Sequence, residues 1–150
     1  MTQKYLSENF YFVVVDDDKD DLELIKDIYE ELQLSHYVKT YTSADDLLEY
    51  LYGKTKNDEL PSLIVLDYNM PKVSGIDLLQ ILKKDIRFES IPIVFYSTTM
   101  TVSIEESLLA AGAAYCHQKP VTIKGVRELM KEIWSIAESF QQRGTLYNSY

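Results

Sequence analysis

"LIVLDYNMPKVSG", residues 63–75, combines a strand signal, an acidic residue and a turn signal within thirteen residues. Its apolar start is typical of a strand buried on both faces, and the Met-Pro pair and Gly75 behind it indicate a turn that leads into a helix. Between these two parts stands Asp67, directly after the last residue of the apolar run. A carboxylate at the end of a buried strand is therefore the feature that the function of the chain has to explain.

Apolar runs of the same kind recur along the chain and alternate with helical patterns. The runs predict strands over residues 11–15, 37–41, 62–66, 93–97 and 114–118. Stripes of helical period predict helices over 20–32, from a Ser43–Asp46 capping box to Gly53, over 75–84, within 101–111, and from Val126 to Phe140. Buried strands separated by helices predict an α/β fold with a parallel sheet and right-handed crossovers.

Length and composition indicate one domain for the whole chain, residues 1–150. A chain of this length with 46% hydrophobic content buries one sizeable core, which we expect to span about residues 10–138. A short extension precedes this core, residues 53–61 are predicted to form an exposed loop, and the tail is predicted to be frayed from Gln141.

Charge and targeting signals exclude several classes of function. The 24 acidic residues outnumber the 15 basic ones, and a net charge of −9 opposes binding to nucleic acid or to an anionic membrane surface. The start, "MTQKYLSENF", lacks the apolar core of a signal peptide, and no apolar run approaches the ~20 residues of a membrane span. We therefore expect a cytoplasmic protein. The single cysteine, Cys116, forms no internal disulfide, which fits a reducing compartment.

Polar residues follow the predicted strands at the points where these strands end. Asp16 and Asp17 follow the first strand, Asp67 the third, Ser97 ends the fourth, and Lys119 follows the fifth. The carboxyl ends of parallel strands lie at one edge of a sheet, so we expect these side chains to converge.

Three carboxylates brought together repel one another unless a cation joins them. Oxygen ligands without a histidine or cysteine cluster favour Mg²⁺, which binds one or two protein carboxylates together with phosphate oxygens. Lys119 supplies a positive charge and Ser97 a hydroxyl for such a phosphoryl group. The pattern thus predicts a nucleophile, a metal site and two phosphate partners.

Other interpretations of these residues are weaker. No G-x-G-x-x-G or Walker loop is present, which disfavours nucleotide binding. A phosphatase with an aspartate nucleophile would place a second acid two residues on, where this chain has Asn69. Asp18, Asp20 and Asp21 are expected only to oppose the dipole at the start of the first helix.

The segments "VVVDDD", "LDYNMPKVSG", "IVFYST" and "QKP" together resemble the receiver domain of bacterial two-component response regulators. The resemblance covers about residues 10–138. It implies a flavodoxin-like, doubly wound sheet of five parallel strands in the order 2-1-3-4-5, with five helices.

The resemblance also implies the roles of the site residues. Asp67 would accept a phosphoryl group from a sensor histidine kinase or a phosphotransfer protein, and Asp16 and Asp17 would hold Mg²⁺ together with Asp67 and the backbone carbonyl of Asn69. Ser97 and Lys119 would bind the phosphoryl oxygens. Such a domain is no enzyme beyond its own phosphoryl transfer and autodephosphorylation, and it acts by binding a target protein.

The chain departs from the family pattern at two positions. Thr98 stands where a small residue commonly admits the phosphodonor and water, and is expected to control access to the site. Cys116 replaces the common aromatic on the last strand, so its link to output is expected to be weak or rerouted through Tyr115 or His117. These departures keep open a receiver-like binding module that works without phosphorylation. The initial methionine and short tail favour a complete protein over a domain from a hybrid kinase.

Overall fold

Five strands and five α-helices alternate along the chain. The computed structural model describes residues 6–54 and 56–148, with residues 58 and 142–148 described through their backbone only. The elements are β1 (Phe12–Val15), α1 (Lys19–Glu31), β2 (Val38–Tyr41), α2 (Ala44–Tyr52), β3 (Ile64–Asp67), α3 (Gly75–Lys84), β4 (Ile93–Ser97), α4 (Val102–Ala110), β5 (Tyr115–Gln118) and α5 (Ile123–Asn148), with short 3₁₀ helices at Ser35–Tyr37 and Asn57–Glu59.

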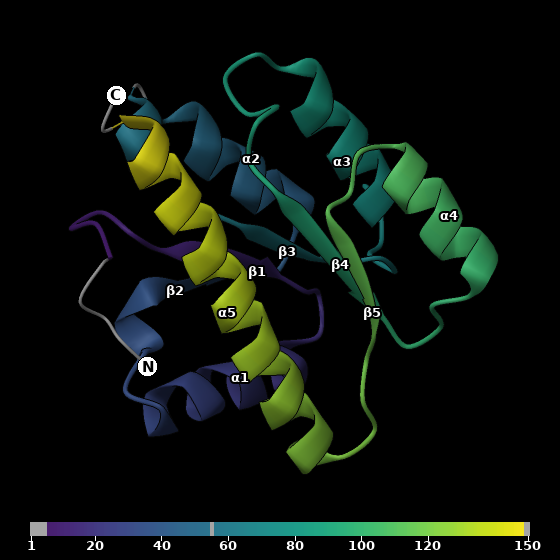
Figure 1. Cartoon of the computed structure of the whole chain (residues 1–150). Coiled ribbons are helices and arrows are strands. Elements are labelled where there is room, and N and C mark those ends of the chain that lie inside the picture. Colours follow the sequence, from purple (N-terminus) through teal and green to yellow (C-terminus); the bar gives the residue numbers. More distant parts are fainter. Residues whose placement is uncertain (1–5, 55, 149–150) are drawn as a thin grey trace.

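The strands form one sheet in the order β2-β1-β3-β4-β5, and every pair of neighbours is parallel (Figure 1). This order confirms the flavodoxin-like, doubly wound fold. The central strands β1, β3 and β4 are buried throughout, whereas the edge strands β2 and β5 are partly exposed because each has a neighbour on one side only.

Helices cover both faces of the sheet. Because successive side chains of a strand point to opposite faces, Phe12 and Val14 of β1 contribute to one core cluster and Val13 and Val15 to the other. The first cluster is completed by α1 and α5, which lie on the same side of the sheet in Figure 1, and the second by α2, α3 and α4.

Local signals place the starts of α2 and α3 as the sequence predicts, whereas α5 begins at Ile123, before the predicted Val126. The Ser43 hydroxyl caps α2 by accepting from the Asp46 amide at 3.1 Å, and Gly53 follows the helix at its other end. At Gly75, a Cβ atom would lie 2.8 Å from the Asp67 carbonyl oxygen and 2.7 Å from the Phe95 ring. Only glycine therefore allows α3 to start this close to the end of β3.

The boundaries differ from the prediction in a few places. β3 runs from Ile64 to Asp67, so the aspartate is the last residue of the strand, where it pairs in register with Tyr96. α5 continues to Asn148, beyond the predicted start of fraying at Gln141, and the expected loop 53–61 contains the 3₁₀ turn Asn57–Glu59. Among the helices that the structure describes, none is long and apolar enough to cross a membrane.

Candidate functional site

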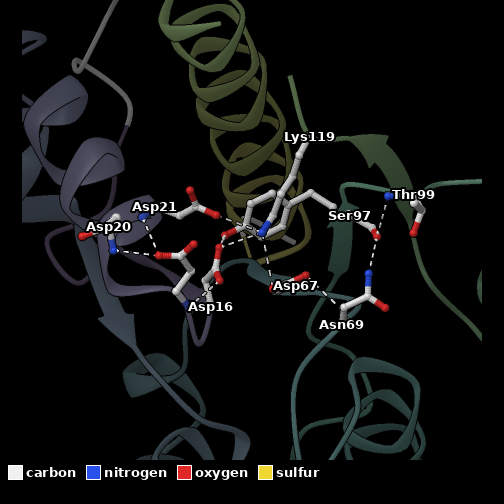
Figure 2. Close-up of polar contacts among 10 residues, drawn as sticks. Asp16, Asp20, Asp21, Asp67, Asn69, Ser97, Thr99 and Lys119 are labelled. Carbon is white, nitrogen blue, oxygen red and sulfur yellow. Dashed lines mark hydrogen bonds and ion pairs between the residues drawn. The ribbon is translucent and has the colours of Figure 1, made fainter. Parts of the chain in front are cut away.

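The carboxyl ends of four strands meet at one edge of the sheet and bring the predicted site residues together (Figure 2). Asp16 directly follows β1, Asp67 ends β3, Ser97 ends β4 and Lys119 directly follows β5. Asp16, Asp67 and Ser97 are almost fully buried, which is unusual for polar side chains. Such groups need specific partners within the protein.

Asp16 has partners on both of its carboxylate oxygens. Oδ1 accepts a hydrogen bond from the Asp18 amide at 2.9 Å. Oδ2 accepts from the hydroxyl of Tyr96 and from the Lys119 ammonium, which lies 3.1 Å away. Asp16 is therefore a buried carboxylate with three hydrogen-bond donors.

Lys119 is the cation at the centre of the site. Its Nζ lies 3.1 Å from Asp16 Oδ2, 3.1 Å from Asp21 Oδ2 and 3.3 Å from Asp67 Oδ2. Burial alone would lower the pKa of Lys119, but the charges of Asp16 and Asp67 outweigh it and hold the pKa above its usual range. The side chain is thus a permanent positive charge among carboxylates.

Asp67 is the most strongly perturbed acid of the site. Burial and the nearby charge of Asp16 raise its pKa to about 7, although Lys119 and the backbone amide of Asn69 oppose the rise. That amide donates to Asp67 Oδ1 at 3.1 Å. A further cation beside Asp67 would favour its ionised form, because an opposite charge lowers the pKa of a carboxylate.

The carboxylates of Asp16, Asp17 and Asp67 fit a hard divalent ion. One oxygen of each lies within 4.8 Å of the others, and Asp17 is exposed whereas Asp16 and Asp67 are buried. All three side chains offer carboxylate oxygens as ligands. This donor set suits Mg²⁺ or a similar ion.

Ser97 is held close to Asp67 by Asn69. The Ser97 hydroxyl oxygen accepts from Asn69 Nδ2 at 3.0 Å and from the Thr99 amide at 3.2 Å, as Figure 2 shows. Thr98, which lies between Ser97 and Thr99 in the chain, is exposed. The predicted roles of the Asn69 carbonyl and of Thr98 as a control of access stay predictions.

Of the acidic residues in "DDDKDD", Asp21 has a contact that the sequence did not predict. Asp18 caps α1, accepting from the Asp20 amide at 2.9 Å, and thus belongs to the helix start as predicted. Asp21, by contrast, reaches across to Lys119, so its assignment to the helix dipole alone was wrong. A signal was present, because Asp21, Ile25 and Ile28 follow the i, i+4, i+7 spacing of the buried face of α1.

Comparisons with known proteins agree with this geometry. Residues 12–132 match the family model described as the response regulator receiver domain. The "Two-component response regulator ARR16" of Arabidopsis thaliana is 30% identical over 132 residues, covering 81% of this chain and 79% of the relative. The "Response regulator Rcp1" of Synechocystis sp. is 25% identical, covering 85% of this chain and 86% of the relative.

A solved structure supports the same relationship. The phosphorylated cyanobacterial phytochrome response regulator RcpA superposes with a TM-score of 0.72 at 26% identity, covering 82% of this chain and 89% of that one. These proteins therefore resemble the present chain in sequence and fold over more than four fifths of its length.

Proposed function

Because the chain belongs to the response regulator receiver domain family, we propose that it is a phosphorylation-dependent signalling switch. In this proposal Asp67 accepts a phosphoryl group from a sensor histidine kinase or a phosphotransfer protein. The observation that carries the proposal is the position of Asp67, buried at the end of β3 with Lys119 3.3 Å away and with two further carboxylates within ligand reach. No purely structural role requires this combination.

Asp16, Asp17 and Asp67 would hold Mg²⁺, with the backbone carbonyl of Asn69 as a further ligand. When bound, the ion supplies positive charge to the phosphoryl oxygens and keeps Asp67 ionised. The spacing of the three carboxylates supports this assignment.

The chemical step uses residues that already surround Asp67. A carboxylate oxygen of Asp67 attacks phosphorus, the bond from phosphorus to the donor nitrogen breaks, and an acyl phosphate forms while the imidazole leaves. Lys119 would turn from Asp67 toward the phosphoryl oxygens, and the Ser97 hydroxyl would donate to one of them. Ser97 accepts from Asn69 in the present structure, so its own proton is available for that bond.

The switch would act by binding a target protein, and its chemistry would be limited to its own phosphorylation and autodephosphorylation. The exposed Thr98, next to Ser97, would then restrict the approach of water to the acyl phosphate. RcpA, a protein of similar fold, is described in a phosphorylated form, and this supports the proposal that the present chain is phosphorylated too.

A second candidate function is a binding module that works without phosphorylation. The observation in its favour is Cys116, a small, partly buried residue at the position where the family commonly has an aromatic. Burial raises the pKa of this thiol to about 11, so it is neutral and behaves as a small packing residue.

Intact-mass spectrometry with a small-molecule phosphodonor distinguishes the two functions. The chain should gain one phosphoryl mass in the presence of Mg²⁺ and lose this gain in excess chelator. The absence of any gain with Mg²⁺ would contradict the switch and favour the binding module. A gain that persists in chelator would remove the metal from the mechanism.

A further inference from the structure

Tyr96 is the buried residue that links β4 to the acidic site. It precedes Ser97 and is 3% exposed, and its side chain belongs to the core cluster under α1 and α5, whereas the neighbouring Phe95 belongs to the opposite cluster. A buried phenol needs a hydrogen-bond partner. In Tyr96 this partner is Oδ2 of Asp16.

The hydroxyl of Tyr96 completes the set of donors around Asp16. A carboxylate has about four lone-pair sites. The Asp18 amide binds Oδ1, while Tyr96 and Lys119 both bind Oδ2, so these three donors leave a lone pair on Oδ1. The direction in which Asp16 offers that oxygen is set by its three partners.

Two further contacts hold Tyr96 itself in place. Its ring lies under the Lys119 ammonium, with Nζ 4.6 Å from the ring centroid, and the ring is enclosed by the core. The phenol is therefore held in place as a donor to Asp16.

We propose that Tyr96 is a positioning residue whose hydroxyl orients Asp16 for the divalent ion. This inference rests on the proposed metal site and adds a residue that lies outside the carboxylate cluster itself. Groups that hydrogen-bond to a metal ligand fix its orientation, and their loss commonly weakens metal binding by about 10- to 100-fold. A residue that only fills the core would alter stability and leave the affinity for the ion unchanged.

The substitution Tyr96→Phe isolates the hydroxyl. It keeps the ring, and hence the core packing and the contact with Lys119, while Asp16 loses one of three donors. Tyr29→Phe is the matched control, because Tyr29 is also fully buried and its hydroxyl donates to the Met130 carbonyl at 2.7 Å, outside the site. Both variants should unfold at lower temperature than the parent.

Calorimetric titration of the full chain with Mg²⁺, without any phosphodonor, gives the decisive readout. Tyr96→Phe should bind Mg²⁺ at least about 10-fold more weakly than the parent, and Tyr29→Phe should bind it as the parent does. Equal affinity in Tyr96→Phe and the parent, or tighter binding, would overturn the positioning role while leaving the proposed function intact. A parent chain that binds no Mg²⁺ would overturn both the positioning role and the proposed metal site, whereas the phosphorylation of Asp67 is tested separately by the mass measurement.

Discussion

Asp21 on α1 lies 3.1 Å from the Lys119 ammonium, at the same distance as the buried Asp16. The cation assigned to the phosphoryl group is therefore shared with a carboxylate that takes no part in the proposed metal site. Asp21 is 40% exposed at its side chain, and burial raises its pKa while Lys119 opposes the rise. In the proposed switch, a phosphoryl group on Asp67 would compete with Asp21 for Lys119.

Replacing Asp21 by asparagine should speed phosphorylation. The substitution removes a competitor for Lys119 and one negative charge near an anionic donor, and a partly exposed ion pair is worth up to about 1 kcal/mol, or roughly fivefold in rate. Asp20→Asn is the control, since it makes the same charge change at an exposed position of the same helix turn. Labelling rates from timed intact-mass spectra should rise in Asp21→Asn beyond the control. A slower rate in Asp21→Asn would show that Asp21 assists Lys119.

Asp17→Asn should separate metal binding from folding. Asp17 is the exposed member of the cluster, so its loss leaves the buried hydrogen bonds intact and removes one repelling charge. Without metal, the variant should be at least as stable as the parent. Added Mg²⁺ should raise the Tm of the parent, because the ion binds only the folded state, and should raise that of the variant much less. An equal rise in both proteins would rule out Asp17 as a ligand.

The contribution of Asp67 to the stability of the metal-free protein should fall as the pH rises toward neutral. Asp67 has an ordinary pKa of 3.8 and a folded-state pKa of about 7, so between these values the folded state binds more protons than the unfolded state. The free energy of unfolding from this group therefore falls with rising pH across that window. Asp67→Asn removes this dependence.

Thermal unfolding in chelator from pH 5 to pH 8 tests this sign. The Tm of Asp67→Asn should exceed that of the parent, and the difference should grow with pH. Each kcal/mol of difference in the free energy of unfolding corresponds to about 2–4 °C in Tm. A difference that is constant over this range would contradict the raised pKa of Asp67.

Much of the fold and site follows from local patterns. Ser43 and Asp46 start α2 through a contact within one helical turn, and Asp67, Ser97 and Lys119 meet because each stands at the carboxyl end of a parallel strand. These inferences need only the order of residues and the rule for strand ends. The order of the strands came from the family resemblance, because the spacing of elements does not determine which strands pair.

The contacts of Tyr96 and Asp21 depend on tertiary packing. In the sequence, Tyr96 looks like any other apolar residue of a buried strand. Its alternation with Phe95 indicates which face of the sheet it occupies, but not which residue its hydroxyl contacts. Its hydroxyl contacts Asp16 because β1 and β4 lie on either side of β3 and end at the same, carboxyl-terminal side of the parallel sheet. Asp21 meets Lys119 because α1 begins just after β1 ends and Lys119 follows β5, so both lie at the carboxyl ends of the parallel strands.

Gln118 links β5 to the loop after β4. Its Oε1 accepts from the Met100 amide at 2.9 Å, and its Nε2 donates to the Thr98 carbonyl. Cys116 packs at the edge of the core cluster under α2, α3 and α4. We therefore expect movement of the loop to reach β5 through Gln118.

Gln118→Ala should increase hydrogen exchange at the Met100 amide, because this amide loses its acceptor and the loop loses a two-point attachment. Cys116→Ala serves as the control and should leave that amide unchanged. Amide exchange followed by NMR measures both effects, first in the unphosphorylated protein and then with a stable phosphoryl mimic. Unchanged exchange at Met100 in Gln118→Ala would show that the loop is held by other contacts.

If Asp67 is the phosphoryl acceptor, labelling of the chain depends on its carboxylate. The parent, Asp67→Asn and Asp77→Asn are incubated with phosphodonor and Mg²⁺, and each intact mass is recorded; Asp77 is an exposed residue of α3 that serves as a matched aspartate control. We expect one added phosphoryl group on the parent and on Asp77→Asn, and none on Asp67→Asn. Full labelling of Asp67→Asn would contradict this role of Asp67.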